Sequence, residues 1–311
     1  LRRRALPKAT SFRVVNAESD FLSGLIVDKY EDVVSFQISS LGMETRKADI
    51  IEVLKSILQP RAIVERNDIG SRKFEGLPEV RAVVYGALDG PVTIDLDGVK
   101  LEVDLLGGHK TGYYLDQQVN YQAVANFAKG ANVLDAFCFI GGFAMHAGKG
   151  GAARVHGLDQ SAEAVAAAGK NARLNGVEEV SSFEATNVFD WLKAQTTAGP
   201  NEKIVPRYDL IVLDPPSFTK NRASVPDALR GYKEIHLRAL KLLKRTGVLA
   251  TFCCSHHVDA NMFQQVILEA AFDARRVLRK IETYSQSPDH PVIPTIPETE
   301  YLKGFAFEIA R

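Results

Sequence analysis

From about residue 130 onward, short apolar runs alternate with helical patterns, and no other feature restricts the fold of this chain as strongly. Such alternation favours a parallel sheet with helices on both faces. We therefore predict an α/β fold for this part of the chain. The predicted strands are 133–137, 154–159, 180–185, 210–213 and 247–252, the predicted helices are 162–175, 187–196, 227–243 and 259–272, and a last pair of strands at 277–284 and 302–309 closes the sheet.

The first hundred or so residues mix strand-like and helical segments without a regular order. Residues 33–38 and 62–64 are strand-like, and residues 44–58 have helical periodicity. Residues 92–103 alternate apolar and polar side chains around an Asp-Gly pair, which is a strong β-hairpin signal. We therefore predict two domains, a small α+β domain at residues 1–105 and a larger α/β domain at residues 106–311. We interpret the three arginines at positions 2–4 as a frayed tail.

The composition fits a well-packed protein of about two domains. The 311 residues include 38 Lys and Arg and 38 Asp and Glu, so any surface for nucleic acid has to be a local patch. No apolar run approaches the ~18 residues that span a membrane, and no signal peptide opens the sequence. Three cysteines without paired spacing indicate a reducing compartment. We expect a cytoplasmic protein without a membrane partner.

Acidic and glycine residues follow the first two predicted strands of the α/β region. In open α/β sheets, ligands bind beyond the carboxyl ends of the strands, near the topological switch point. Asp135 and the Gly141-Gly142 turn follow the first strand, and Asp159 ends the second. Glycines let a ligand approach the backbone, and an acid after the second strand can accept hydrogen bonds from ribose hydroxyls. This pattern indicates nucleoside binding; the competing interpretation is a tight turn and a surface aspartate.

The sequence Asp214-Pro215-Pro216-Ser217-Phe218 follows a further predicted strand. Each proline fixes its own φ and restricts the residue before it, so the loop is stiff. Such a loop suits a flat, polar ring such as a nucleobase, with the phenylalanine stacking on it. An ordinary double-proline turn has no need of an acid before it and an aromatic ring after it.

Two cysteines and two histidines end the next predicted strand, at Cys253, Cys254, His256 and His257. Because side chains alternate along a strand, at most one of the two cysteines faces the ligand cleft. The four side chains are too crowded for the usual zinc spacing, so we predict no metal. Two interpretations stay open: a pair of buried structural cysteines, or one nucleophilic thiolate whose pKa is lowered by a helix N-terminus or a protonated histidine.

Two weaker signals lie elsewhere in the chain. Residues 110–117, which include Tyr114, combine aromatic rings, a cation and amides, and they form either a binding segment or the lead-in to a helix. Arg230 and Lys233 either contact phosphate or solvate the surface of a helix.

At these residues the chain resembles the class I S-adenosylmethionine-dependent methyltransferases, and more closely the bacterial large-subunit ribosomal RNA cytosine-5 methyltransferase family. The resemblance covers nearly the whole chain. The segments that carry it are 12–15, 24–28, 72–76, 110–117, 141–142, 214–216, 230–233, 254–255, 290–293 and 301–305. It implies a Rossmann-like, seven-stranded sheet with an antiparallel last strand, beside the smaller N-terminal α+β domain.

The same resemblance implies S-adenosyl-L-methionine as the cofactor, bound at the strand ends. The residues that it assigns to the cofactor are Asp135, Phe137, Gly141, Asp159, Gln160, Asn187, Asp214 and Tyr114. Asn187 departs from the family pattern, because an acid usually stands there near the adenine amino group.

The resemblance further implies that the Cys254 thiolate adds to carbon-6 of a cytosine in 23S ribosomal RNA, so that carbon-5 can accept the methyl group. Asp214 would hold the ring nitrogen and the exocyclic amine. The residues assigned to the RNA substrate are Pro215, Pro216, Phe218, Arg230 and Lys233. Ser217 stands where other RNA cytosine-5 methyltransferases have a second cysteine, so the base that removes the carbon-5 proton is unassigned.

A second departure concerns the N-terminus. Members of the family usually begin with a small RNA-binding domain of the pseudouridine-synthase-and-archaeosine-transglycosylase (PUA) type, for which this chain has no room; we expect it to be lost or to be missing from a fragment. The nearest competing function is an N-methyltransferase of nucleic-acid bases. A nicotinamide-dependent oxidoreductase, disfavoured by the missing third glycine, and a non-catalytic RNA-binding module are more distant competitors. The sequence leaves a homodimer open.

Overall fold

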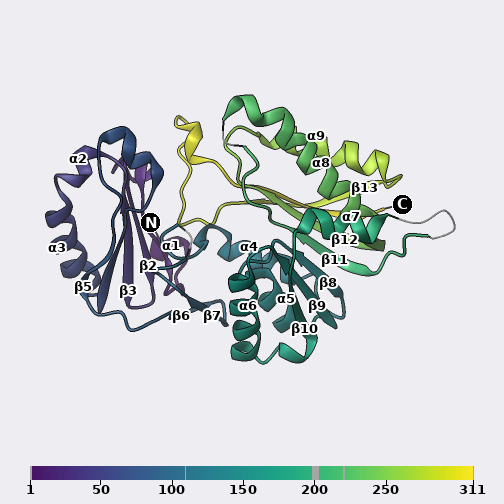
Figure 1. Cartoon of the computed structure of the whole chain (residues 1–311), viewed down its shortest axis with the longest axis horizontal. Coiled ribbons are helices and arrows are strands. Elements are labelled where there is room, and N and C mark those ends of the chain that lie inside the picture. The colour runs from purple at the N-terminus through teal and green to yellow at the C-terminus, as the bar shows by residue number, and fades with distance from the viewer. Residues whose placement is uncertain (1, 109, 198–202, 220, 311) are drawn as a thin grey trace. The chain divides into compact units, whose positions relative to one another are not determined.

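The computed structural model describes residues 2–108, 110–197, 203–219 and 221–310 (Figure 1). The chain forms two compact units. The first unit consists of Leu1–Gln118 and Ser287–Glu300, and the second unit consists of Val119–Gln286 and Tyr301–Arg311. The domain boundary predicted between residues 105 and 106 stays a prediction; by their packing, residues 106–118 and 287–300 lie with the first unit.

The first unit is built on a five-stranded sheet in the order β1-β2-β3-β4-β5. Neighbouring strands are antiparallel except for the parallel pair β3 and β4. The strands are β1 (Phe12–Asn16), β2 (Leu25–Tyr30), β3 (Val33–Ile38), β4 (Ala62–Arg66) and β5 (Arg81–Gly86), and the helices are α1 (Arg2–Ala5), α2 (Leu41–Glu44) and α3 (Lys47–Leu58). Leu54 of α3 packs with apolar side chains of β2, β3 and β4 to form the core of this unit.

The predicted hairpin is confirmed as β6 (Val92–Leu96) and β7 (Val99–Val103). Asp97 and Gly98 between them have φ values of 54° and 81°, the left-handed conformation that a tight two-residue hairpin turn requires. The helix predicted to begin at residue 44 begins at Lys47, because the short helix α2 ends at Glu44. Strands β1, β2 and β5 were not predicted.

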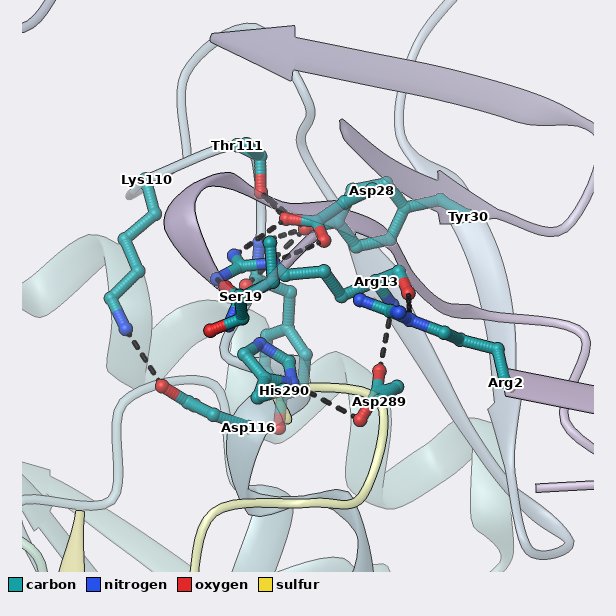
Figure 2. Close-up of polar contacts among 12 residues, drawn as sticks. Arg2, Arg13, Ser19, Asp28, Tyr30, Lys110, Thr111, Asp116, Asp289 and His290 are labelled. Atoms are coloured by element: carbon teal, nitrogen blue, oxygen red, sulfur yellow. Dashed lines mark hydrogen bonds and ion pairs between the residues drawn. The ribbon is translucent and has the colours of Figure 1, made fainter. Parts of the chain in front are cut away.

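The face of the five-stranded sheet opposite α3 carries buried polar side chains (Figure 2). Arg13 Nε and Nη2 donate to the two carboxylate oxygens of Asp28 at 2.8 and 2.9 Å. The Thr111 hydroxyl also donates to Asp28, at 2.5 Å. The backbone N–H of Arg13 donates to Asp289 at 2.7 Å. These contacts attach residues 110–118 and 287–290 to the sheet. The expectation of a frayed tail is wrong for Arg2, which forms an ion pair with Asp20.

The second unit contains a seven-stranded sheet in the order β10-β9-β8-β11-β12-β14-β13. Its strands are β8 (Asn132–Ala136), β9 (Arg154–Asp159), β10 (Ser181–Ala185), β11 (Tyr208–Leu213), β12 (Leu243–Cys253), β13 (Leu278–Ser285) and β14 (Lys303–Ile309). The strands from β10 to β12 are mutually parallel, whereas β14 is antiparallel to both of its neighbours. The α/β fold class and the antiparallel last strand are confirmed.

Helices cover both faces of this sheet (Figure 1). They are α4 (Gln118–Ala125), α5 (Gly142–Lys149), α6 (Ala162–Asn175), α7 (Val188–Thr196), α8 (Val225–Leu242) and α9 (Ala260–Asp273). The last three form a core with one face of the sheet, whereas α5 and α6 pack against β8, β9 and β10 on the other face. The predicted caps of α6 are confirmed: the Ser161 hydroxyl accepts from Ala164 N at 3.1 Å, and Gly176 has φ 65°.

Short 3₁₀ helices occur at η1 (Ala17–Asp20), η2 (Gly70–Glu75), η3 (Leu115–Gln117), η4 (Glu178–Val180), η5 (Arg222–Ser224) and η6 (Pro297–Thr299). No helix among the described residues combines the length and the apolar character needed to cross a membrane. The chain passes from β8 outward through β9 to β10 and then returns to β11 on the other side of β8. The topological switch point therefore lies between the carboxyl ends of β8 and β11, where α/β sheets bind ligands.

Candidate functional site

The turn after β8 has a strained backbone. Phe137 and Phe139 have φ values of 69° and 49°, a region that bulky side chains rarely occupy. The predicted strand 133–137 therefore ends one residue early, at Ala136. Cys138 N donates to Leu158 O at 2.8 Å, which holds the turn against β9. Strain of this kind concentrates at ligand sites, where the surrounding structure enforces it.

The backbone conformation at the end of this turn favours glycine at position 141. Its φ of 90° is unfavourable for residues with a side chain. Asn171 of α6 donates to the Ile140 carbonyl at 3.0 Å, so the turn is also fixed from below. The turn thus leads directly into α5, whose N-terminal N–H groups follow the strand end.

Asp135 is a buried acid with an incomplete set of partners. Its side chain is 1% exposed, and Oδ2 accepts a hydrogen bond from Ala144 N at 2.9 Å. Its Oδ1 has no hydrogen-bond partner among the described residues. Burial, assisted by the negative charges of Asp214 and Asp159, raises the pKa of Asp135 to about 8. Three acidic side chains therefore lie near one another at the switch point, and the negative charges of Asp214 and Asp159 favour a cationic ligand.

Asp159, at the end of β9, is held by two backbone donors. Phe139 N donates to Oδ2 and Ser161 N donates to Oδ1, both at 2.9 Å. A carboxylate can accept about four hydrogen bonds, so both oxygens retain capacity for the hydroxyls of a ligand. Gln160, the next residue, is exposed.

Asn187 is exposed and caps α7. Its Oδ1 accepts from Phe189 N at 2.9 Å and from Asp190 N at 3.3 Å. The side chain can therefore offer a ligand the N–H donors of its amide, whereas an acid at this position would offer acceptors. Asn187, which replaces the acid usual in the family, thus changes the hydrogen-bonding character of this position from acceptor to donor.

The loop after β11 presents its residues at different depths. Pro215 is buried, Pro216 and Ser217 are exposed, and Phe218 is partly buried. The Phe218 ring centroid lies 4.6 Å from that of Tyr232 in α8 and 5.6 Å from that of Phe189 in α7. One side of the Phe218 ring is thus anchored on the protein core, and stacking of a nucleobase on this ring stays a prediction.

The two adjacent cysteines differ in environment, as the alternation of side chains predicts. Cys253 is fully buried in the core, and its Sγ donates to the Tyr232 hydroxyl at 3.3 Å. Cys254 follows the end of β12 and is partly exposed. His256 and His257 are exposed. Within the described residues, no group of three or more His, Cys, Asp or Glu is arranged to hold a metal ion.

Two serines join the loop at residues 214–218, here called the proline loop, to the segment at residues 253–255, here called the cysteine loop. The hydroxyls of Ser217 and Ser255 are 2.9 Å apart, and the Ser255 hydroxyl is also 3.1 Å from that of Tyr232. The Lys303 ammonium donates to the Ser255 carbonyl at 2.8 Å. The structure therefore brings residues 214–218 and 253–255 together. Sequence reasoning missed this link, because it treated Ser217 only as the replacement of a cysteine.

The remaining predicted residues are Tyr114, Arg230 and Lys233, and each interacts with a neighbouring side chain. Tyr114 belongs to the first unit, where the Lys110 ammonium lies 4.5 Å from its ring centroid. Arg230 forms an ion pair with Asp227, and Lys233 forms one with Asp273 at 3.0 Å. Exposed pairs of this kind contribute about 0–1 kcal/mol, so both cations can exchange these partners for phosphate.

Residues 87–305 match the family model of S-adenosylmethionine-dependent methyltransferases. A protein of Shewanella denitrificans named ribosomal RNA large subunit methyltransferase I is 39% identical over 302 residues, which are 96% of this chain and 75% of the relative. The protein of the same name in Aeromonas hydrophila subsp. hydrophila is 42% identical over 298 residues, which are 95% of this chain and 74% of the relative.

Solved structures share the fold. SMU.776, a proposed methyltransferase crystallised with SAH, superimposes with a TM-score of 0.83 at 22% identity, over 99% of this chain and 78% of its own. The tRNA m1G37 methyltransferase of M. jannaschii has a TM-score of 0.62 at 16% identity, over 92% of this chain and 74% of its own. At these identities the likeness establishes the fold alone.

Proposed function

Because the chain belongs to the S-adenosylmethionine-dependent methyltransferase family, we propose that it transfers a methyl group from this cofactor to carbon-5 of a cytosine in ribosomal RNA. The names of the relatives support RNA of the large subunit, hence 23S RNA, as the substrate. We infer that the reaction takes place in the cytoplasm. The carbon-5 target is supported by Cys254 and its surroundings.

The residues at the switch point fit the cofactor. S-adenosylmethionine carries a sulfonium and an ammonium cation, and it supplies an electrophilic methyl group. Asp135 has a buried carboxyl oxygen that lacks a partner among the described residues, which suits the cationic methionine part. Asp159 suits the ribose hydroxyls, with Gln160 beside it, and the Asn187 amide suits an acceptor of the adenine ring.

The proposed role of Cys254 is nucleophilic. Carbon-5 of cytosine is a weak nucleophile, and addition of the thiolate to carbon-6 forms an S–C6 bond and pushes electron density onto carbon-5. Carbon-5 would then bond to the methyl group while the bond between that group and the cofactor sulfur breaks, which leaves S-adenosylhomocysteine. A base removes the carbon-5 proton, the electron pair of that C–H bond restores the C5–C6 double bond, and the thiolate leaves. Asp214, at the edge of the same loop, would hold the ring nitrogen and the exocyclic amine.

One observation carries this proposal: the partly exposed Cys254 is linked, through its neighbour Ser255, to the loop that follows Asp214. Cys253, by contrast, is buried among core side chains and cannot present its thiol to a substrate. The chain therefore offers one cysteine, and not the other, to a base held at the Asp-Pro-Pro loop.

The test is incubation with labelled cofactor and ribosomal RNA, followed by nucleoside analysis by mass spectrometry. The expected product is 5-methylcytidine, and Cys254→Ala should abolish it while S-adenosylhomocysteine still binds. Cys253→Ala is the matched control; it should lose about 1 kcal/mol of stability and retain the product. A methyl group on an exocyclic nitrogen, formed equally well by Cys254→Ala, would instead establish the base N-methyltransferase.

A further inference from the structure

The Tyr232 hydroxyl contacts the residues on both sides of Cys254. It accepts a hydrogen bond from Cys253 Sγ at 3.3 Å and lies 3.1 Å from the Ser255 hydroxyl. Both neighbours are fully buried, whereas Cys254 between them is partly exposed. The Tyr232 hydroxyl oxygen thus joins Cys253, the last residue of β12, to Ser255, the second residue of the loop beyond it.

Counting protons gives these hydrogen bonds a direction. Each hydroxyl has one proton to donate. When Ser217 donates its proton to the Thr219 carbonyl at 3.1 Å, it accepts from Ser255, whose hydroxyl is 2.9 Å away. Ser255 in turn accepts from Tyr232, and Tyr232 accepts from the Cys253 thiol. The four side chains form a head-to-tail chain that ends on a backbone carbonyl, and every proton in it is used.

The Tyr232 ring is fixed in place. It is fully buried, with its centroid 4.6 Å from that of Phe218 and 5.3 Å from that of Phe263. The Tyr232 carbonyl also bonds to His236 Nδ1 at 2.6 Å. Burial raises the pKa of Tyr232 far above its usual range, so the hydroxyl keeps its proton as a donor at all working pH values.

The cysteine loop is also bonded to strand β14 of the sheet. The Lys303 ammonium donates to the Ser255 carbonyl at 2.8 Å, and Cys253 pairs with Lys303 in the β12–β14 ladder. Ser255 is therefore held through its hydroxyl by α8 and the proline loop, and through its carbonyl by β14. The backbone of Cys254 has little freedom to move between these anchors.

We propose that Tyr232 is a positioning residue for Cys254: its hydroxyl clamps both neighbours of the cysteine and, through Ser255 and Ser217, sets the thiol against the Asp-Pro-Pro loop. The inference rests on the proposed nucleophilic role of Cys254. A displacement of about 1 Å at a reacting atom can lower a rate about a hundredfold. The clamp therefore acts on the rate of adduct formation rather than on the reactivity of the thiol or on cofactor binding.

The test compares Tyr232→Phe with Tyr284→Phe. Tyr284 is also buried, but its hydroxyl has no hydrogen-bond partner in the described part of the chain, so it is a matched control. The substrate is ribosomal RNA in which 5-fluorocytidine replaces cytidine. Fluorine on carbon-5 cannot be removed by a base, so the S–C6 adduct persists and its formation can be timed. Alkylation of Cys254 by iodoacetamide, followed by peptide mass spectrometry, reports the thiol alone.

Tyr232→Phe should slow adduct formation at saturating RNA and cofactor about ten- to a hundredfold. Its alkylation rate and its affinity for S-adenosylhomocysteine should stay within about twofold of wild type. Tyr284→Phe should match the wild type in all three measurements. Ser217 is exposed, so it supplies a second test without risk to the core: Ser217→Ala should slow adduct formation, and Ser217→Thr, which keeps the hydroxyl, should restore it.

Two results would overturn the clamp. In the first, Tyr232→Phe and Ser217→Ala form the adduct at the wild-type rate. In the second, alkylation falls in parallel with adduct formation, because the hydroxyl would then act on thiol reactivity. Failure of the proposed function looks different: the wild-type enzyme itself would form no adduct, whatever residue stands at position 232.

Discussion

Each of the two units contains a fully buried aspartate, Asp28 in the first and Asp135 in the second, and the two differ in their hydrogen-bond partners. Asp28 of the first unit is fully buried and receives two hydrogen bonds from the Arg13 guanidinium and one from Thr111. Asp135 of the second unit is buried to the same degree, yet it receives one backbone hydrogen bond and has two acids near it. Within the described residues, no cation forms an ion pair with Asp135.

We propose that this difference separates a structural aspartate from a functional one. A buried charge that is paired and fully hydrogen-bonded holds segments together, and Asp28 does so for β1, β2 and Thr111. A buried acid that lacks a partner is unfavourable by itself and is retained where a ligand completes it. We therefore propose that Asp28 holds segments of the first unit together, whereas the buried oxygen of Asp135 in the second unit is completed by the cofactor.

The largest effect should come from removing the partner of the structural aspartate. Arg13→Ala leaves the Asp28 carboxylate buried without its cation, which should cost about 3–5 kcal/mol of unfolding free energy. Denaturant unfolding at neutral pH measures this. Arg61→Ala is the matched control, because the Arg61–Asp32 pair is exposed and should be worth less than about 1 kcal/mol. Equal losses of stability in both variants would show that the buried Arg13–Asp28 pair contributes no more than an exposed ion pair.

The functional aspartate should reveal itself through pH. Its raised pKa stabilises the ligand-free protein below about pH 4, and this contribution is lost as the pH rises through about 8. A cationic ligand prefers the carboxylate. The Kd of S-adenosylhomocysteine should therefore rise by up to about fiftyfold, or about 2 kcal/mol, from pH 8 to pH 6.

Asp135→Asn is the sharpest control for that pH dependence. It should bind S-adenosylhomocysteine weakly and with an affinity that changes little from pH 8 to pH 6, and calorimetric titration measures both. A variant with the wild-type slope would assign the titration to another group.

A smaller effect is expected at Asp159. Its carboxylate accepts hydrogen bonds from Phe139 N and Ser161 N. Its hydrogen bonding is therefore more complete than that of Asp135 and less complete than that of Asp28. Asp159→Asn should weaken cofactor binding about tenfold, or about 1.4 kcal/mol, because one ribose hydroxyl loses its charged acceptor. Adenosine inhibition provides the readout, since it reports the ribose contact without the methionine part. An unchanged affinity would show that the ribose does not contact Asp159.

The smallest effect concerns Asn187, whose oxygen is committed to α7. Asn187→Ala removes the helix cap and should cost about 1 kcal/mol of stability, with no more than a few-fold change in cofactor affinity. Thermal unfolding and ligand titration together measure this. A large loss of affinity with unchanged stability would make Asn187 a principal adenine contact rather than a cap.

Local signals predicted much of the fold. The hairpin at Asp97-Gly98 and the helix bounded by Ser161 and Gly176 are confirmed. Both could be predicted because the residues that form a turn or a helix cap are close together in the sequence. Strand β2 was missed because Asp28 and Lys29 interrupt its apolar pattern. The reason for burying that acid is an arginine 15 residues away, which no local pattern reveals.

The same limit applies to the site. Asp135 and Asp159 were predicted from their place at strand ends, and they meet at the switch point as expected. The end of β8 at Ala136, one residue before the predicted end, was not foreseen, since the left-handed backbone at Phe137 is enforced by contacts of the turn with β9 and α6. The contact of Ser217, Tyr232 and Ser255 joins three distant segments through single hydroxyl groups, so only the folded chain shows it.

The central step of the proposed reaction is the formation of a covalent bond between Cys254 and the pyrimidine. It is tested by digesting the complex formed with 5-fluorocytidine RNA and cofactor, and by identifying the modified peptide by mass spectrometry. The account predicts a methylated fluorocytidine bonded to the sulfur of Cys254. An adduct on Cys138 or Cys253, or 5-methylcytidine made from normal RNA by an enzyme that never forms an adduct, would contradict it.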